Sequence, residues 1–360
     1  MMDTQNQTNP LAPLEPILSD PAVTEVMIDG YKRVYVERRG KLEDAPNLFH
    51  NDKEVMALIE AILAPLGLQV NESSPMVDAR LADGTRVNIV IPPVALNGPT
   101  ITMRKYVKFP LTIEDLIGFG SCSPEIFAFL RACVHSRLNI IVAGGTGSGK
   151  TTVLNLLAGM IPDNERIIVV QNTGELQLPQ KYVVTLESRP PNLEGKGEVT
   201  LQDLLLNALR MRPDRLILSE ARGAEVLTLL EAINTGHDGS MVNIHANSAR
   251  DVLARLEIMV TYANPSIPLL KIREMIATAI DLIAYQERLP DGSRKILKVT
   301  EVVGMQGEAI GLTDIFEFRQ TGLVDGKIMG YFAATGEIPK LLKRMQAGGV
   351  ELPLSLFKPG

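Results

Sequence analysis

The chain has 360 residues, of which 45% are hydrophobic and 22% charged, and its formal net charge is −6. It is too long and too apolar to be disordered, and its acidic balance disfavours a uniformly basic surface for nucleic acid. Its apolar runs are far shorter than the roughly 18 residues of a membrane span, and its polar start lacks a secretory pattern. Two cysteines, Cys122 and Cys133, cannot make a disulfide framework. We expect a soluble cytosolic protein of about two domains.

The first hundred residues predict a small α+β domain. Residues 23–37 have a strand, turn, strand pattern around Asp29-Gly30, and residues 77–91 repeat it around Asp83-Gly84. Apolar residues at helical spacing predict a helix over 53–66, and residues 101–105 predict a further strand. We place the domain boundary between residues 107 and 108.

The remainder of the chain, residues 108–360, predicts an α/β domain. Thr112 with Asp115, and Ser123 before Pro124, have the pattern of helix N-termini. Short apolar strands are predicted over 138–143, 166–170, 182–186, 215–219 and 241–245, and helices over 124–137, 150–161, 201–211, 223–234 and 249–262. This alternation predicts a largely parallel sheet covered by helices. After about residue 281 the pattern returns to strands, with a turn at Asp291-Gly292, as a C-terminal extension.

A P-loop pattern, G-x-x-x-x-G-K-[ST], lies between a predicted strand and a predicted helix. Its residues are Gly144, Gly145, Thr146, Gly147, Ser148, Gly149, Lys150 and Thr151, and we assign Thr152 to the same site. Glycines let backbone N–H groups converge on phosphate oxygens at a helix N-terminus. Lys150 would reach the β- and γ-phosphates, and Thr151 would hold Mg²⁺. The alternative is a glycine-rich turn that binds nothing, which the full pattern and its context disfavour.

Other polar residues follow the predicted strands. Glu220 ends the strand 215–219, which we expect beside the P-loop strand, where an acid would face Mg²⁺ or the attacking water. His237 and His245 flank the strand predicted over 241–245, and the sequence shows no metal-ligand spacing around them. They either contact a γ-phosphate, pass its presence to a neighbouring element, or are ordinary structural histidines. Basic residues occur at five places: Arg104-Lys105, Arg189, Arg210, Arg212 and Arg222. They either reach a neighbouring subunit's phosphates or form a solvated surface.

Together these motifs resemble the ATPases of the type II/type IV secretion and pilus-assembly superfamily, and most closely its CpaF-like branch from Tad/Flp pilus systems. The similarity extends over nearly the whole chain. The segments that carry it include Asp78-Ala79-Arg80-Leu81, Ile101-Thr102-Met103-Arg104-Lys105, the P-loop, Glu220-Ala221-Arg222-Gly223, Gly236-His237-Asp238-Gly239-Ser240 and His245-Ala246-Asn247.

The resemblance implies a RecA-like P-loop ATPase domain preceded by a small α+β N-terminal domain, six copies forming a ring, and ATP with Mg²⁺ as cofactors. It maps a Walker B glutamate to Glu220, a second catalytic acid to Glu175, and the His box to His237 and His245. Lys150 is the catalytic lysine, and Mg²⁺ is held by Thr151 and, through water, by Glu220. The family's phosphate-approaching arginines map to Arg104, Arg210 and Arg212, in cis or in trans.

Members of this family work at the cytoplasmic face of the inner membrane on an integral membrane platform protein. The resemblance therefore implies a peripheral motor for pilus assembly or secretion, and the acidic balance of the chain disfavours direct nucleic-acid contact. One alternative is an ATPase of conjugative DNA transfer, which shares the fold and the chemistry. Another is a regulatory subunit that binds nucleotide and hardly hydrolyses it.

The sequence departs from the family at one motif. The acidic pair of the Asp box is replaced by Gln171-Asn172, although Glu175 remains. An amide can orient water but cannot accept its proton at neutral pH. The sequence therefore predicts intact nucleotide binding with slow hydrolysis, and it predicts that restoring the two acids raises kcat. The alternative is that the pair only stabilises a turn.

Overall fold

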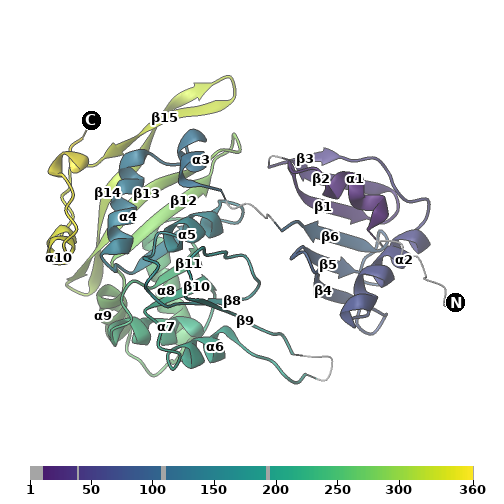
Figure 1. Cartoon of the computed structure of the whole chain (residues 1–360), viewed down its shortest axis with the longest axis horizontal. Helices are drawn as coiled ribbons and strands as arrows, with labels where there is room; N and C mark the ends of the chain where they lie inside the picture. The colour runs from purple at the N-terminus through teal and green to yellow at the C-terminus, as the bar shows by residue number, and fades with distance from the viewer. Residues whose placement is uncertain (1–10, 39, 107–110, 192–194, 360) are drawn as a thin grey trace. The chain divides into compact units, whose positions relative to one another are not determined.

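The computed structural model describes residues 11–38, 40–106, 111–191 and 195–359. The chain divides into two compact units, Met1–Phe109 and Pro110–Gly360 (Figure 1). The boundary expected between residues 107 and 108 lies outside the described residues. Within the described ranges, no helix combines the length and the apolar character needed to cross a bilayer.

The N-terminal unit is an antiparallel sheet with helix α2 (Asp52–Leu63) packed on it. The strand order is β3-β2-β1-β6-β5-β4, with bounds β1 Val23–Asp29, β2 Arg33–Arg38, β3 Lys41–Asp44, β4 Met76–Arg80, β5 Arg86–Val90 and β6 Thr100–Arg104. Short helical turns occupy Ala12–Leu14, Glu15–Leu18 (α1) and Ala64–Leu66. The α2 residues buried in the core are those at the predicted helical spacing: Val55, Leu58, Ile59, Ile62 and Leu63. The predicted α+β domain is confirmed.

The C-terminal unit is built on one mixed sheet, in the order β15-β14-β13-β12-β7-β11-β10-β8-β9. Six neighbouring strands are parallel: β7 Ile140–Gly144, β8 Ile167–Gln171, β9 Val183–Glu187, β10 Arg215–Ala221, β11 Met241–His245 and β12 Leu282–Arg288. Three antiparallel strands extend one side: β13 Arg294–Gln306, β14 Ala309–Val324 and β15 Lys327–Ala334. The predicted parallel sheet with a later strand extension is therefore confirmed.

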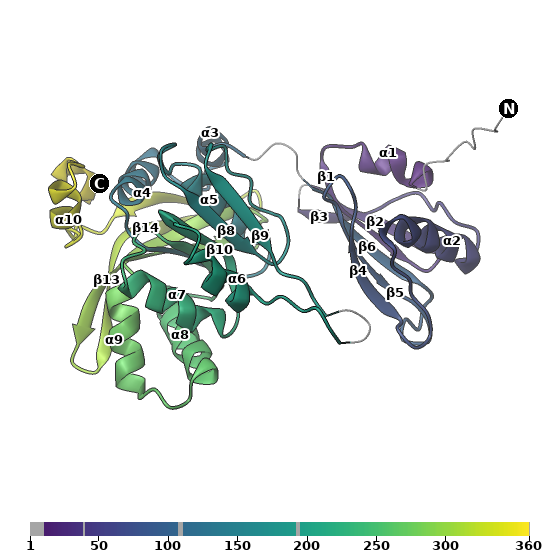
Figure 2. The same cartoon turned by 60° about the horizontal axis from the view of Figure 1, so that its bottom comes forward.

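Helices cover both faces of this sheet. The helices are α3 Ile113–Gly118, α4 Pro124–His135, α5 Lys150–Ala158, α6 Leu201–Ala208, α7 Glu225–Asn234, α8 Ala249–Ala263, α9 Leu269–Ala279 and α10 Leu342–Ala347. One core cluster joins the sheet to α4 and α5, and the other joins it to α6–α9 (Figure 2). Because β7 and β8 are buried along their whole length, their sequences are continuously apolar rather than alternating.

Helix α9 was not predicted from the sequence. It buries only Ile272, Ile276 and Ala279, and it begins after Pro268 without a side-chain cap. It therefore lacks the N-terminal capping signal that Thr112 and Ser123 supply to α3 and α4. Helices α5 and α6 also end three residues earlier than predicted, at Ala158 and Ala208.

The chain's last elements pack back onto the C-terminal unit. A short 3₁₀ helix, Leu354–Phe357, inserts Phe357, which lies 5.7 Å from the Phe129 ring and 5.9 Å from the Phe316 ring. Arg344 of α10 donates to Asp281 Oδ1 at 2.7 Å. The C-terminal extension is thereby part of the same core as the P-loop strand.

Candidate nucleotide-binding site

The P-loop connects strand β7 to helix α5 at the carboxyl edge of the parallel strands. Gly147 and Gly149 have φ values of +71° and +93°, a backbone region that other residues seldom adopt. Gly149 is the N-cap of α5, and it supplies no side chain to the helix's first N–H groups. These N–H groups and the positive end of the helix dipole are suited to an anion.

Three donors of the loop converge on one oxygen, the carbonyl of Gly145. Lys150 Nζ donates to it at 2.8 Å, Ser148 Oγ at 2.9 Å and the Ser148 N–H at 3.4 Å. An ammonium, a hydroxyl and an amide are also the donors that phosphate oxygens accept from. The loop therefore presents a ready cluster of anion-binding donors.

Lys150 is 7% exposed, and its burial lowers its pKa from the usual value. The carboxylates of Glu220 and Glu175 act in the opposite direction and favour its charged form. A buried ammonium gains most from a nearby anion, because charge interactions strengthen as water is excluded. A phosphate beside Lys150 would supply that anion.

Glu175 faces the start of α5. Its Oε2 accepts a hydrogen bond from Thr151 Oγ1 at 3.1 Å. The turn that carries Glu175 is fixed by Gln171, which is 1% exposed and whose Oε1 accepts from the backbone N–H groups of Glu175 and Leu176 at 3.2 and 3.3 Å. Thr152 follows Thr151 on α5 and is half-buried.

The two amides that stand in place of the acidic pair of the Asp box therefore have hydrogen-bond partners. Asn172 Oδ1 accepts from Ser188 Oγ at 2.9 Å, which joins the turn to the residue after β9. Gln171 holds the backbone of the Glu175 turn from inside. This geometry favours the alternative in which the pair stabilises a turn, and it leaves Glu175 as the acid that contacts Thr151.

Glu220 lies near the end of β10 and contacts two basic side chains, Arg222 and His245. Arg222 Nη2 donates to its Oε2 at 2.6 Å, and His245 Nε2 lies 2.7 Å from its Oε1. Glu220 Oε1 is buried and accepts no hydrogen bond of regular geometry within the described residues, although His245 Nε2 lies this close to it. Burial lowers the pKa of His245, and Lys150 lowers it further, whereas Glu220 alone would raise it.

The strand that carries Glu220 does not lie where the sequence predicted. We expected its strand to lie directly beside the P-loop strand, but β11 lies between β10 and β7. His245 at the end of β11 pairs in register with Gly144, so the histidine occupies the adjacent position. The Glu220 carboxylate reaches the site across β11 by its contact with His245.

The two histidines of the predicted His box lie at opposite edges of the sheet. His237 precedes β11, whose first residue Met241 pairs with Ile140 at the amino end of β7. Its Nδ1 lies 3.0 Å from the carbonyl of Ala232 in α7. A five-residue strand separates the two histidines of one chain by about 15 Å, and their assignment to the His box stays a prediction.

The sequence also assigned three arginines to the nucleotide, one in the N-terminal unit and two in the C-terminal unit that carries the P-loop. Arg104 ends β6 in the N-terminal unit, is 60% exposed and lies 3.7 Å from Glu25 Oε1. Arg210 is exposed, and Arg212 is 83% exposed and lies 3.7 Å from Asp214 Oδ2. Both precede Arg215, the first residue of β10, and so lie at the amino edge of the sheet. Within the C-terminal unit they are a full strand length from the loop.

Strand β12 and the start of β13 contribute residues that sequence analysis missed. Gln286 of β12 pairs with Gly144, and Arg294 Nε donates to the carbonyl of Gly147 at 2.8 Å. A cavity of about 370 Å³ lies between the P-loop and Arg288 of β12. The sequence signal for Arg288 and Arg294 is their position on either side of the Asp291-Gly292 turn. The turn predicts that the two arginines face each other, but it does not predict that they lie beside the P-loop.

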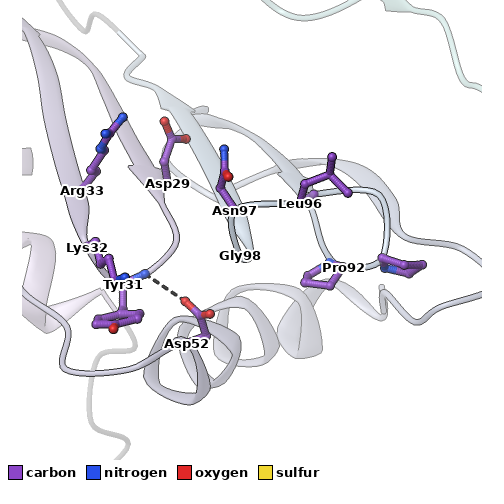
Figure 3. Close-up of a pocket in the computed structure, with 11 residues that line it drawn as sticks. Asp29, Tyr31, Lys32, Arg33, Asp52, Pro92, Leu96, Asn97 and Gly98 are labelled. Carbon is purple, nitrogen blue, oxygen red and sulfur yellow. Dashed lines mark hydrogen bonds between the residues drawn. The ribbon is translucent and has the colours of Figure 1, made fainter.

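A second cavity, of about 710 Å³, lies in the N-terminal unit, between the β1–β2 turn and the loop before β6 (Figure 3). Its charged lining residues are of both signs: Asp29, Lys32, Arg33 and Asp52. The Asp52 carboxylate accepts from the Tyr31 N–H at 3.0 Å, so this acid stabilises the turn. No residue that we assigned to nucleotide from the sequence lines this cavity.

The comparisons with known proteins identify the family. A family model described as type II/IV secretion system protein matches residues 7–307, which is most of the chain. The chain belongs to this family. The similarity therefore extends across the P-loop, Glu220 and both histidines.

Two relatives and one solved structure illustrate the similarity. An uncharacterised protein of Methanocaldococcus jannaschii is 44% identical over 236 residues, which are 63% of this chain and only 33% of that protein. A putative conjugal transfer protein of Mycobacterium tuberculosis is 32% identical over 306 residues, covering 83% of this chain and 86% of the relative. The ATPase DotB of Legionella pneumophila superposes with a TM-score of 0.60 at 21% identity, over 82% of this chain and 81% of that one, which shows a shared fold. None of these three identifies the Tad/Flp branch.

Proposed function

We propose that this protein is a homohexameric ATPase that hydrolyses ATP with Mg²⁺ and powers a secretion or pilus-assembly machine. The observation that carries the proposal is the group at one sheet edge: Lys150 on a P-loop, Glu175 on Thr151, and Glu220 with His245. Cationic and acidic groups of this kind bind a polyphosphate and orient a water. Membership of the secretion family supports the biological role.

Each residue has a proposed task. Lys150 and the N–H groups of residues 144–151 bind the phosphates, with Thr152 beside them. The donor set fits Mg²⁺, which prefers oxygen ligands: the Thr151 hydroxyl would hold it directly and Glu220 through water. The metal, when bound, would neutralise phosphate charge. Glu220 positions and deprotonates the attacking water, His245 orients Glu220, and Glu175 orients Thr151.

The arginines support an assembled enzyme. Because Arg210 and Arg212 lie at the amino edge of their own sheet, we assign them to a neighbouring copy's nucleotide rather than to their own. Arg104, from the N-terminal unit, is also assigned to a nucleotide contact, with either its own chain's nucleotide or that of a neighbouring copy. We further propose that the ring acts at the cytoplasmic face of the inner membrane on an integral membrane platform protein, and that the Tad/Flp pilus system is the machine.

The first experiment separates binding from chemistry. Lys150→Ala is expected to weaken binding of MgATP by tenfold or more, because the loop loses its ammonium. Glu220→Gln is expected to bind MgATP as the wild type does but to hydrolyse it at least a hundredfold more slowly, since an amide cannot take the water's proton. Equilibrium binding and single-turnover hydrolysis measure the two steps. Wild-type turnover by both variants would refute the ATPase proposal.

The second experiment tests assembly. Nucleotide that spans a subunit boundary stabilises the ring by mass action, so light scattering should show about six copies with MgATP. Arg210→Ala and Arg212→Ala are expected to lower turnover more than they lower the thermal unfolding temperature. A monomer at micromolar protein with MgATP would contradict the hexamer.

Two alternatives have specific support. The mycobacterial relative carries the name of a conjugal transfer protein, which favours an ATPase of DNA transfer. A DNA-transfer enzyme that contacts DNA should bind it with a steep salt dependence, whereas the acidic chain predicts none. The Gln171-Asn172 pair favours a regulatory subunit with slow hydrolysis, and steady-state phosphate release distinguishes that from a motor.

A further inference from the structure

Strand β12 lies directly against the P-loop strand. It is parallel to β7, and its residue Gln286 pairs with Gly144. A Cβ atom on Gly144 would lie 2.1 Å from the backbone oxygen of Gln286, and one on Gly149 would lie 3.2 Å from Gln286 Nε2. The carboxyl end of β12 therefore supports both ends of the loop, and the hairpin that follows it emerges beside the loop.

That hairpin places two arginines opposite each other. Arg288, the last residue of β12, pairs with Arg294, the first residue of β13. Side chains of a cross-strand pair lie on the same face of the sheet, and like charges at such positions repel one another. A phosphate beside the pair would interact favourably with both positive charges.

Both arginines reach the apex of the P-loop. Arg294 Nε donates to the Gly147 carbonyl at 2.8 Å, and Arg294 Cδ would be 3.3 Å from a Cβ on Gly149. Arg288 Nη1 would be 3.7 Å from a Cβ on Gly147. This hydrogen bond holds the Gly147 peptide in place from outside the loop. Arg294 therefore acts by positioning the loop.

Arg288 has a different position. It lines the cavity of about 370 Å³ together with Gly145, Thr146 and Ser148 of the loop and with Asn247 after β11. Glu287 also lines it, and its Oε2 accepts from Tyr285 Oη at 2.8 Å. Gly145 is also the residue on whose carbonyl Lys150 Nζ converges. Because Lys150 is expected to reach the β- and γ-phosphates, the cavity adjoins, at Gly145, the part of the loop expected to hold the terminal phosphates.

We propose that Arg288 binds the terminal phosphate of a nucleoside triphosphate from the same chain as the P-loop, and that Arg294 is a positioning residue that fixes the loop through Gly147. This inference rests on the proposed nucleotide site. A planar guanidinium can donate two parallel hydrogen bonds to a phosphate, which a lysine cannot. The pair would let the site distinguish a triphosphate from a diphosphate without a neighbouring subunit's arginine.

The test compares binding of a non-hydrolysable ATP analogue with binding of ADP by the full chain. Arg288→Gln is expected to weaken binding of the analogue by about tenfold or more, the effect of one charge-assisted hydrogen bond, and to change ADP binding less than about twofold. Arg294→Gln is expected to weaken both ligands by a similar factor, because the whole loop loses its support. Arg131→Gln, a change at an exposed arginine on α4, is the matched control and should leave both affinities unchanged.

The outcomes separate this inference from the proposed function. If Arg288→Gln leaves the ratio of the two affinities unchanged while Lys150→Ala abolishes binding, the inference fails and the P-loop assignment stands. If Lys150→Ala binds both ligands normally, the proposed site itself fails. Should Arg288→Gln not fold, Arg288→Lys is measured instead. It keeps the charge and should reduce the preference for the triphosphate analogue about threefold, and an unchanged preference overturns the inference.

Discussion

At the scale of single residues, the site depends on which oxygen each donor reaches. Lys150 Nζ, Ser148 Oγ and the Ser148 N–H meet at Gly145 O, and Thr151 Oγ1 meets Glu175. The Gln171 side chain is directed instead at the backbone of the turn that carries Glu175. Chemistry and scaffolding are therefore divided between residues only four positions apart.

This division changes the prediction for the double variant Gln171→Glu with Asn172→Asp. A carboxylate at 171 can accept the same two backbone N–H bonds, and one at 172 can accept the Ser188 hydroxyl. We therefore expect kcat to stay within about twofold of wild type, or roughly 0.4 kcal/mol in activation free energy, rather than to rise as the sequence alone predicts. Single-turnover hydrolysis measures it. A tenfold increase would mean that one of these side chains faces the attacking water after all.

At the scale of secondary-structure elements, the contact of β12 with β7 fixes the P-loop. Gly144→Ala would place a methyl group 2.1 Å from the Gln286 carbonyl oxygen, so β12 must move. We expect the free energy of unfolding to fall by about 1–3 kcal/mol, the usual cost of overpacking. Denaturant unfolding followed by circular dichroism measures this value.

The neighbouring glycine supplies the control for that prediction. A Cβ on Gly145 meets no atom within 4 Å, so Gly145→Ala should change the free energy of unfolding by less than about 0.5 kcal/mol. Equal destabilisation by the two substitutions would show that the loss comes from the loop's backbone freedom and not from the packing of β12 against β7.

At the scale of the whole molecule, the C-terminal segment is held to the sheet of the C-terminal unit by a buried acid. Glu301 of β13 is 2% exposed, and it accepts the backbone N–H groups of Leu341 and Lys340 at 2.8 and 3.1 Å. Burial raises the pKa of Glu301 above its usual value, although those two hydrogen bonds act to lower it. The protonated acid is thus favoured by the fold.

The raised pKa gives a pH dependence of known sign. The folded state binds the proton of Glu301 more tightly than the unfolded state, so this group's stabilisation is full below about pH 4.5 and is lost as pH rises through the raised pKa. The free energy of unfolding of wild type minus that of Glu301→Gln should therefore decrease between about pH 4.5 and pH 7. Urea unfolding at several pH values measures the difference. A difference that grows with pH would mean that folding lowers the pKa of Glu301 instead of raising it.

Much of the fold followed from the sequence because its signals are local. Continuous apolar runs gave the buried strands, caps such as Thr112 with Asp115 gave helix starts, and the spacing of Gly144 to Thr151 gave the phosphate-binding loop. These patterns depend on one residue and its neighbours within a few positions, where backbone preference and burial act directly. Helix α9, which begins after Pro268 without a capping side chain, shows where such a local signal is missing.

The order of strands was decided only by the tertiary structure. The sequence determined that Glu220 and His245 each lie at the carboxyl end of a strand, and that His237 lies before the strand that His245 ends. It could not determine that β11 and β12, rather than β10, flank β7. Strand neighbours are selected by how whole helices and strands pack into one core, a property of contacts between distant segments. For that reason the P-loop could be predicted from eight consecutive residues, whereas Arg288 and Arg294 became part of the site only once β12 was found beside it.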